Sequence, residues 1–124
     1  MELQLRVYES DGETVVEISG DVELHSAPRL REELRLICEV ENPCCVVDMS
    51  GVPFIDSTGV GVLVGALKRA REHDGNLTIA RPQPRVRRVF EITGLLGALP
   101  IYDSLEVARD ACAPKFPRAK SLTV

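Results

Sequence analysis

The fold is decided by the stretch "CCVVDMSGVPFIDSTGVGVL", residues 44–63, in which a polar tetrad separates two apolar runs. The first run is short and continuous, ends near Asp48, and predicts a buried central strand. From Ser57 onward the apolar residues recur at helical spacing, which predicts a helix. The Asp-Ser-Thr-Gly tetrad (56–59) therefore follows the carboxyl end of a strand and opens the next helix, a position where α/β folds place their binding sites.

Strands and helices alternate on both sides of this stretch. Two strands at 3–8 and 14–18, joined by the turn "ESDGE", predict a hairpin. The segment 25–40 predicts a helix with Ser26 as its N-cap. Further strands are predicted at 77–80 and 99–104, and further helices at 84–94 and 105–112. This order predicts an α/β fold with a mainly parallel mixed sheet, opened by a β-hairpin and packed against helices.

Length and composition indicate one globular domain over residues 1–112, followed by a flexible tail over residues 113–124. The net charge of -4 and pI of about 5.2 argue against a surface for nucleic acid or anionic membrane. The basic group Arg81, Arg85, Arg87 and Arg88 is therefore interpreted as a solvated helix start. No apolar run approaches the ~20 residues that span a bilayer, so we expect a soluble, cytoplasmic protein.

The four cysteines, Cys38, Cys44, Cys45 and Cys112, lack the spacing of a zinc site. Adjacent residues of a strand point to opposite faces, so Cys44 and Cys45 cannot easily bond to each other or share one ion. We expect buried thiols and no metal site.

The tetrad contains a serine, and the sequence argues against a catalytic role for it. A nucleophile elbow needs Gly two residues before the serine, where this chain has Ile55. Of the two histidines, His73 lies ~24 Å away along the helix that Ser57 opens. His25, in the loop after the second strand, could come close to Ser57, but one histidine without an elbow is weak support for catalysis. We expect no catalytic residues and no enzyme activity.

The same stretch raises three other hypotheses: nucleotide binding, phosphoryl transfer to an aspartate, and helix capping. Gly59, Gly61 and Gly65 miss the spacing of a dinucleotide fingerprint and lie inside the helical pattern, so we expect no cofactor. Asp48 resembles the phospho-accepting residue of response-regulator receivers, but "YDSLEVA" offers no Lys after the last strand, and the opening hairpin does not fit a receiver. Ser57 is also a good helix N-cap, which is compatible with a further role.

Three motifs of the chain are distinctive: the tetrad at 56–59, "FEITGLLG" at 90–97 and "GDVELHSAPRL" at 20–30. With these motifs the chain resembles STAS domains from about residue 3 to residue 111, and most of all the free-standing anti-sigma factor antagonists of bacteria. The resemblance implies an STAS-type fold. It also implies a protein that binds an anti-sigma factor, itself a serine kinase, and thereby releases a sigma factor.

The resemblance further implies that the kinase uses ATP to phosphorylate Ser57, which switches binding off, and that a phosphatase reverses the reaction. Thr58 is the alternative acceptor. Glu23 takes the place of an Asp that lies near the serine in many relatives. The expected partner-binding residues are Glu23, Asp56, Ser57, Thr58 and Gly59. We expect a monomer when the protein is free. The alternative within the family is an STAS subunit of another assembly, such as a stressosome component or an accessory subunit of a lipid transporter.

Overall fold

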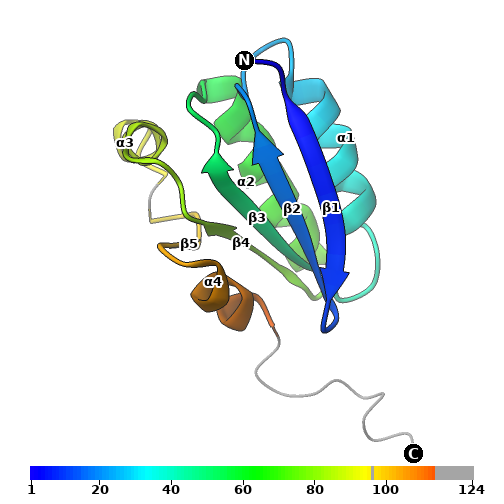
Figure 1. Cartoon of the computed structure of the whole chain (residues 1–124). Helices are drawn as coiled ribbons and strands as arrows, with labels where there is room; N and C mark the ends of the chain where they lie inside the picture. Colours follow the sequence, from blue (N-terminus) through cyan, green and yellow to red (C-terminus); the bar gives the residue numbers. More distant parts are fainter. Residues whose placement is uncertain (96, 114–124) are drawn as a thin grey trace, which may run out of the picture.

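A computed structural model describes residues 1–95 and 97–113 of the chain (Figure 1). It contains a five-stranded sheet and helices on both faces of that sheet. The elements in chain order are β1 (Gln4–Ser10), β2 (Glu13–Ser19), α1 (Ala27–Cys38), β3 (Cys44–Gly51), α2 (Ser57–Glu72), β4 (Asn76–Ala80), α3 (Pro84–Ile92), β5 (Ile101–Tyr102) and α4 (Leu105–Cys112). The predicted order of strands and helices is confirmed, although β5 is shorter than the predicted 99–104.

The strands lie in the sheet in the order β1-β2-β3-β4-β5. The β1–β2 pair is antiparallel and every other pair is parallel. Asp11 and Gly12 join the hairpin with φ of 53° and 82°, the left-handed values that a tight hairpin turn requires. The hairpin and the mainly parallel mixed sheet are therefore as predicted.

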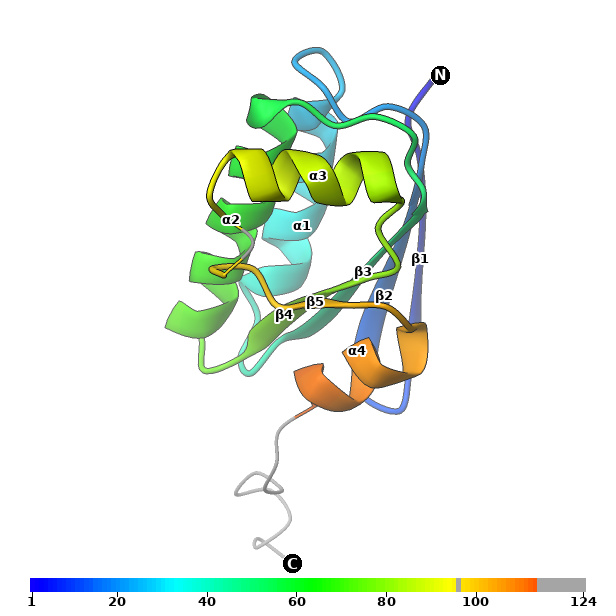
Figure 2. The ribbon, with the colours of Figure 1, turned by 90° about the vertical axis from the view of Figure 1, so that its left-hand side faces the viewer.

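Helices α1 and α2 cover one face of the sheet, and α4 covers part of the other face (Figures 1 and 2). The larger core lies under α1 and α2, and α3 joins it through the buried side chains of Val86 and Phe90. A smaller core lies under α4 and includes Val15, Val46 and Ala108. Because β3 is buried on both faces by these two cores, its sequence is a continuous apolar run until Asp48.

Ser26 occupies the predicted N-cap position of α1, but its side chain makes no capping hydrogen bond to the helix. Its hydroxyl instead donates to the carbonyl of Asp21 (2.8 Å) and accepts from the backbone N–H of Glu23 (3.0 Å). Ser26 therefore shapes the loop before α1 rather than the helix end. The tail predicted for 113–124 lies, from residue 114, outside the described residues.

Candidate functional site

Two loops meet at the carboxyl ends of β2 and β3. The first, residues 20–26, leads into α1, and the second, residues 52–56, leads into α2. Val22 and Ile55 form a short parallel bridge between them. The backbone N–H of Val22 donates to the carbonyl of Phe54 (2.9 Å), and the N–H of Asp56 donates to the carbonyl of Val22 (3.1 Å). The sheet thus continues briefly beyond its strands and holds both loops in one fixed arrangement.

Asp56 caps α2 and ties the loops together. One of its carboxylate oxygens accepts from the backbone N–H of Gly59 (3.0 Å), and the other accepts from the N–H of Leu24 (3.0 Å). Its backbone is extended, with φ of -109°, as an N-cap requires. The hypothesis that Ser57 is the N-cap is therefore wrong, because the carboxylate of the preceding residue occupies that role.

Ser57 is the first residue of α2 and is exposed to solvent. Thr58, beside it, is half-buried. Within the described residues, no hydrogen-bond partner is found for the backbone N–H groups of Ser57 and Thr58, as is usual in a first helical turn. The Ser57 hydroxyl thus lies beside free backbone donors at the positive end of the helix dipole, an environment that favours a negative group.

Gly59 completes the tetrad for a packing reason. It is buried at the contact between the first turn of α2 and the two loops. A Cβ at this position would lie 2.7 Å from Cγ1 of Ile55 and 2.7 Å from Cγ1 of Val22. Only glycine allows the helix to start this close to the bridge, so Gly59 sets the position of Ser57 relative to the loops.

The structure places Glu23 in the first loop but gives its side chain another task. One carboxylate oxygen accepts from the backbone N–H groups of His25 (3.1 Å) and Ser26 (3.0 Å). Both of these hydrogen bonds stay within its own loop. Glu23 therefore supports the loop that carries Leu24, and no hydrogen bond joins it to Ser57 among the described residues.

Two apolar side chains on these loops are absent from the predicted partner-binding residues. Leu24 is 60% exposed and Phe54 is 46% exposed, although the loops that carry them are fixed by backbone hydrogen bonds. Exposed large apolar residues on a rigid surface are typical of contact sites. The sequence offered one signal for these two residues: each loop carries an apolar residue close to an acidic one, Leu24 in "VEL" and Phe54 in "VPFID".

We expect Asp56→Ala to lower the free energy of unfolding by about 1–2 kcal/mol, because it removes the cap of α2 and the bond to Leu24. Asp56→Asn keeps an oxygen acceptor and should lose much less. Urea denaturation of both variants measures the difference. Equal stability of Asp56→Ala and the parent would show that the cap contributes nothing.

The histidines lie where neither ring bonds to Ser57. The Nδ1 of His73 lies 2.8 Å from the carbonyl of Arg69, at the far end of α2. His25 is exposed in the first loop, and its backbone N–H donates to Glu23.

No group of three or more potential metal ligands is found among residues 1–95 and 97–113. Over the same residues, no helix combines the length and the apolar character needed to cross a bilayer.

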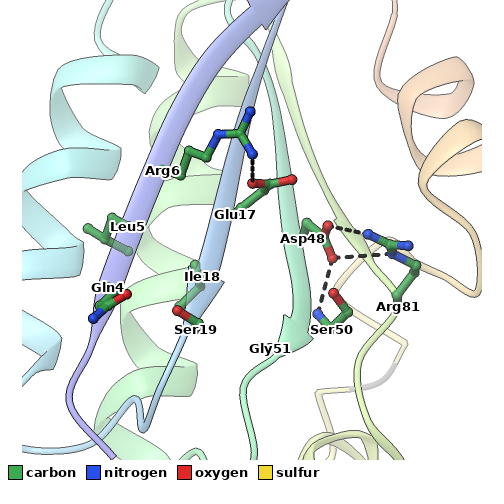
Figure 3. Close-up of a pocket in the computed structure, with 10 residues that line it drawn as sticks. All are labelled: Gln4, Leu5, Arg6, Glu17, Ile18, Ser19, Asp48, Ser50, Gly51 and Arg81. Atoms are coloured by element: carbon green, nitrogen blue, oxygen red, sulfur yellow. Dashed lines mark hydrogen bonds and ion pairs between the residues drawn. The ribbon is translucent and has the colours of Figure 1, made fainter.

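A depression of about 410 Å³ lies away from the two loops, on the face of the sheet that α4 leaves open (Figure 3). Its charged groups pair with one another. Arg6 on β1 bonds to Glu17 on β2 (3.2 Å), and Arg81 bonds to both carboxylate oxygens of Asp48 on β3. These charges already have partners, and the two ion pairs join β1 to β2 and β3 to the residue that follows β4. The basic group predicted from the sequence is therefore not one free patch, because Arg81 forms an ion pair with Asp48.

Asp48 is a buried carboxylate with a lowered pKa. Burial by itself raises the pKa, but hydrogen bonds from Arg81 and from the backbone N–H of Ser50 (3.1 Å) outweigh burial and hold the pKa below its usual value. A lowered pKa in the folded state means that the carboxyl binds its proton more weakly when folded than when unfolded. Its contribution to stability is therefore complete above the unfolded-state pKa of about 4 and is lost as the pH falls through the folded-state value.

We expect the free energy of unfolding to fall as the pH is lowered below about 4, and the fall to be shallower in Asp48→Asn than in the parent. The matched control is Asp103→Asn, because Asp103 pairs with Arg87 but its side chain is 93% exposed. Denaturation by urea across the acid range measures both. An unchanged acid profile in Asp48→Asn would contradict the role assigned to this pair.

Comparison with known proteins agrees with the fold and identifies the family. Residues 4–108 match the STAS domain. The anti-sigma-B factor antagonist of Bacillus subtilis is 35% identical over 97 residues, which cover 77% of this chain and 86% of that protein.

Solved structures add two comparisons. An anti-sigma factor antagonist from Mycobacterium paratuberculosis superposes with a TM-score of 0.81 at 27% identity, covering 90% of this chain and 94% of that one. The Bacillus cell fate determinant SpoIIAA, solved in its phosphorylated form, superposes with a TM-score of 0.65 at 23% identity. The superposition covers 90% of this chain and 100% of that one, and it shows that the two share a fold. This chain therefore belongs to the STAS domain family and, within it, to the anti-sigma factor antagonists.

Proposed function

We propose that this chain antagonises an anti-sigma factor by binding it over the two loops and the first turn of α2. One observation carries the proposal: exposed Ser57 lies at a rigid surface that also presents the exposed side chains of Leu24 and Phe54. Apolar anchors around a polar centre are typical of a protein-binding surface. Binding here would occupy the anti-sigma factor and release its sigma factor.

The proposed switch is phosphorylation of Ser57 by the anti-sigma factor acting as a serine kinase. The exposure of Ser57 supports this residue over half-buried Thr58 as the acceptor. A phosphate adds a charge of about -1.5 to -2, and the helix dipole and the free N–H groups tolerate it. The fold would survive, while a partner docked over Ser57 would have to desolvate the phosphate. Phosphorylation would therefore end binding without unfolding the protein.

The kinase supplies ATP and catalysis, a phosphatase restores Ser57, and this chain contributes only the acceptor and the surface. Asp56 and Gly59 act by positioning Ser57, and Glu23 acts by holding the loop of Leu24. Binding and phosphorylation would take place in the cytoplasm. Residues 1–112 would act as one domain, which is monomeric when free.

The test is capture of partners from the native bacterium on the immobilised full chain, followed by mass spectrometry. We expect an anti-sigma factor with a kinase domain in the eluate, and phosphate on Ser57 after incubation of that protein with ATP. Recovery of a transporter ATPase or of stressosome proteins in its place would transfer the function to another STAS assembly.

We expect Phe54→Ala to weaken binding of the anti-sigma factor about tenfold to a hundredfold, because an aromatic anchor in a protein contact contributes about 1–3 kcal/mol. The change should leave stability nearly unaffected, since the side chain is 46% exposed. Val107→Ala is the matched control, because Val107 is 51% exposed on α4, on the other face of the sheet. Calorimetry measures both affinities. Equal losses in the two variants would remove Phe54 from the proposed contact.

A further inference from the structure

Four buried thiols lie on the two faces of the sheet in two pairs. Cys45 and Cys38 belong to the larger core under α1 and α2. Cys44 and Cys112 belong to the smaller core under α4. Cys44 and Cys45 are adjacent in β3, so the strand itself separates the two pairs. All four are free thiols.

The pair under α4 lies where the last turn of a helix meets the start of two strands. Cys112 is the last residue of α4, and its sulfur lies 3.5 Å from the carbonyl oxygen of Cys45 and 3.5 Å from that of Asn76. Asn76 is the residue opposite Cys44 in the β3–β4 register. The sulfur of Cys112 therefore sits over the start of these two strands, beside the Cys44 side chain that points to the same face.

The two pairs also differ in their exposure to solvent. Cys44 is 8% exposed and Cys112 is 4% exposed, whereas Cys38 and Cys45 are both fully buried. Cys112 lies in the terminal turn of a short helix, and helix ends open more readily than strands in the centre of a sheet. A small oxidant therefore reaches the pair under α4 before the pair under α1.

We propose that Cys44 and Cys112 form a reversible intramolecular disulfide when the protein meets hydrogen peroxide, and that Cys38 and Cys45 remain thiols. The modification site is thus the contact between the last turn of α4 and the first residue of β3. It lies on the opposite face of the sheet from α1 and α2 and does not depend on the proposed function.

The reaction balances with peroxide as the oxidant. We assign the first attack to Cys112, because its sulfur lies in the terminal turn of α4, and hydrogen bonding with the Cys44 thiol lowers the pKa of Cys112. Its sulfur takes one oxygen from peroxide, the O–O bond breaks, one water leaves, and a sulfenic acid forms. The sulfur of Cys44 then attacks that of Cys112 and the hydroxyl departs as a second water. Two electrons pass from the thiols to peroxide, and a dithiol reverses the change by exchange.

The cross-link would join β3 to the last described helix and close a long loop of chain. Cross-links that close long loops restrict the unfolded chain most, which raises the melting temperature. We expect a rise of roughly 5–15 °C on oxidation, reversed by dithiothreitol.

The experiment treats the full chain with hydrogen peroxide after removal of reductant. Intact mass should fall by two hydrogen atoms, and non-reducing peptide mapping should find the peptides of Cys44 and Cys112 joined. Cys112→Ser should abolish the mass change, and the matched variant Cys38→Ala should retain it.

Mapping of the parent protein decides the proposal even if a variant fails to fold. A joined Cys38–Cys45 pair, links only between molecules, or oxygen adducts without a cross-link would each overturn it.

Discussion

Gly59→Ala should destabilise the protein by about 3 kcal/mol and lower its melting temperature by roughly 10–20 °C. The added methyl group would lie 2.7 Å from side-chain atoms of both Val22 and Ile55, and 3.0 Å from the backbone oxygen of Val22. Both side chains are buried at the bridge that joins the two loops, so neither has free space to move into. The first turn of α2 would have to shift, and Ser57 with it.

The same helix provides the control. A Cβ on Gly61 meets nothing within 4 Å, and Gly61 is exposed. Gly61→Ala should therefore raise the free energy of unfolding by up to about 1 kcal/mol, since alanine favours a helix interior over glycine. Urea denaturation measures the free energy of unfolding of both variants. We expect it to fall in Gly59→Ala and to rise in Gly61→Ala, although the two positions are only two residues apart. A loss in Gly59→Ala no larger than in Gly61→Ala would refute the packing role of Gly59.

Ser57→Asp should weaken binding to the anti-sigma factor about a hundredfold or more. The new carboxylate follows Asp56 directly, within a surface that the partner has to cover. Desolvating or repelling such a charge costs several kcal/mol, and ~3 kcal/mol corresponds to a hundredfold change. Ser57→Ala should bind like the parent and lose its response to ATP. Because Asp56 is the cap, the stability of Ser57→Ala should stay within about 0.5 kcal/mol of the parent.

Two controls separate charge from size and from the neighbouring hydroxyl. Ser57→Asn has the size of the acidic variant without its charge and should bind far better than it does. Thr58→Ala should keep the response to ATP if Ser57 is the acceptor. Calorimetry with and without ATP measures all four variants. Parent-like affinity of Ser57→Asp in both conditions would remove Ser57 from the interface and with it the proposed switch.

The strands and helices could be predicted because their signals are local. The continuous run of β3 and the helical spacing after Ser57 each reflect burial imposed by immediate neighbours. The choice of cap between Asp56 and Ser57 could not be predicted, because both residue types cap well. That choice depends on residues far away in the chain: the backbone N–H of Asp56 donates to the carbonyl of Val22, and the Asp56 carboxylate accepts from the N–H of Leu24.

The centre of the candidate site could be predicted, and its edges could not. Ser57 and Asp56 stand out in the sequence as polar residues between apolar runs. The exposure of Leu24 and Phe54 depends on how two distant loops meet, and so does the engagement of Glu23 by its own loop. Sequence periodicity carries no information about such contacts between loops.

The order of strands across the sheet is the same as their order along the chain. During synthesis, each strand that leaves the ribosome would meet the preceding strand already available for pairing, and pairing is far faster than the addition of residues. Both loops of the site and the first turn of α2 precede residue 72, the end of that helix. We therefore expect the surface around Ser57 to assemble on a nascent chain that still lacks β4, β5 and α4, so that these later elements add to a site already formed.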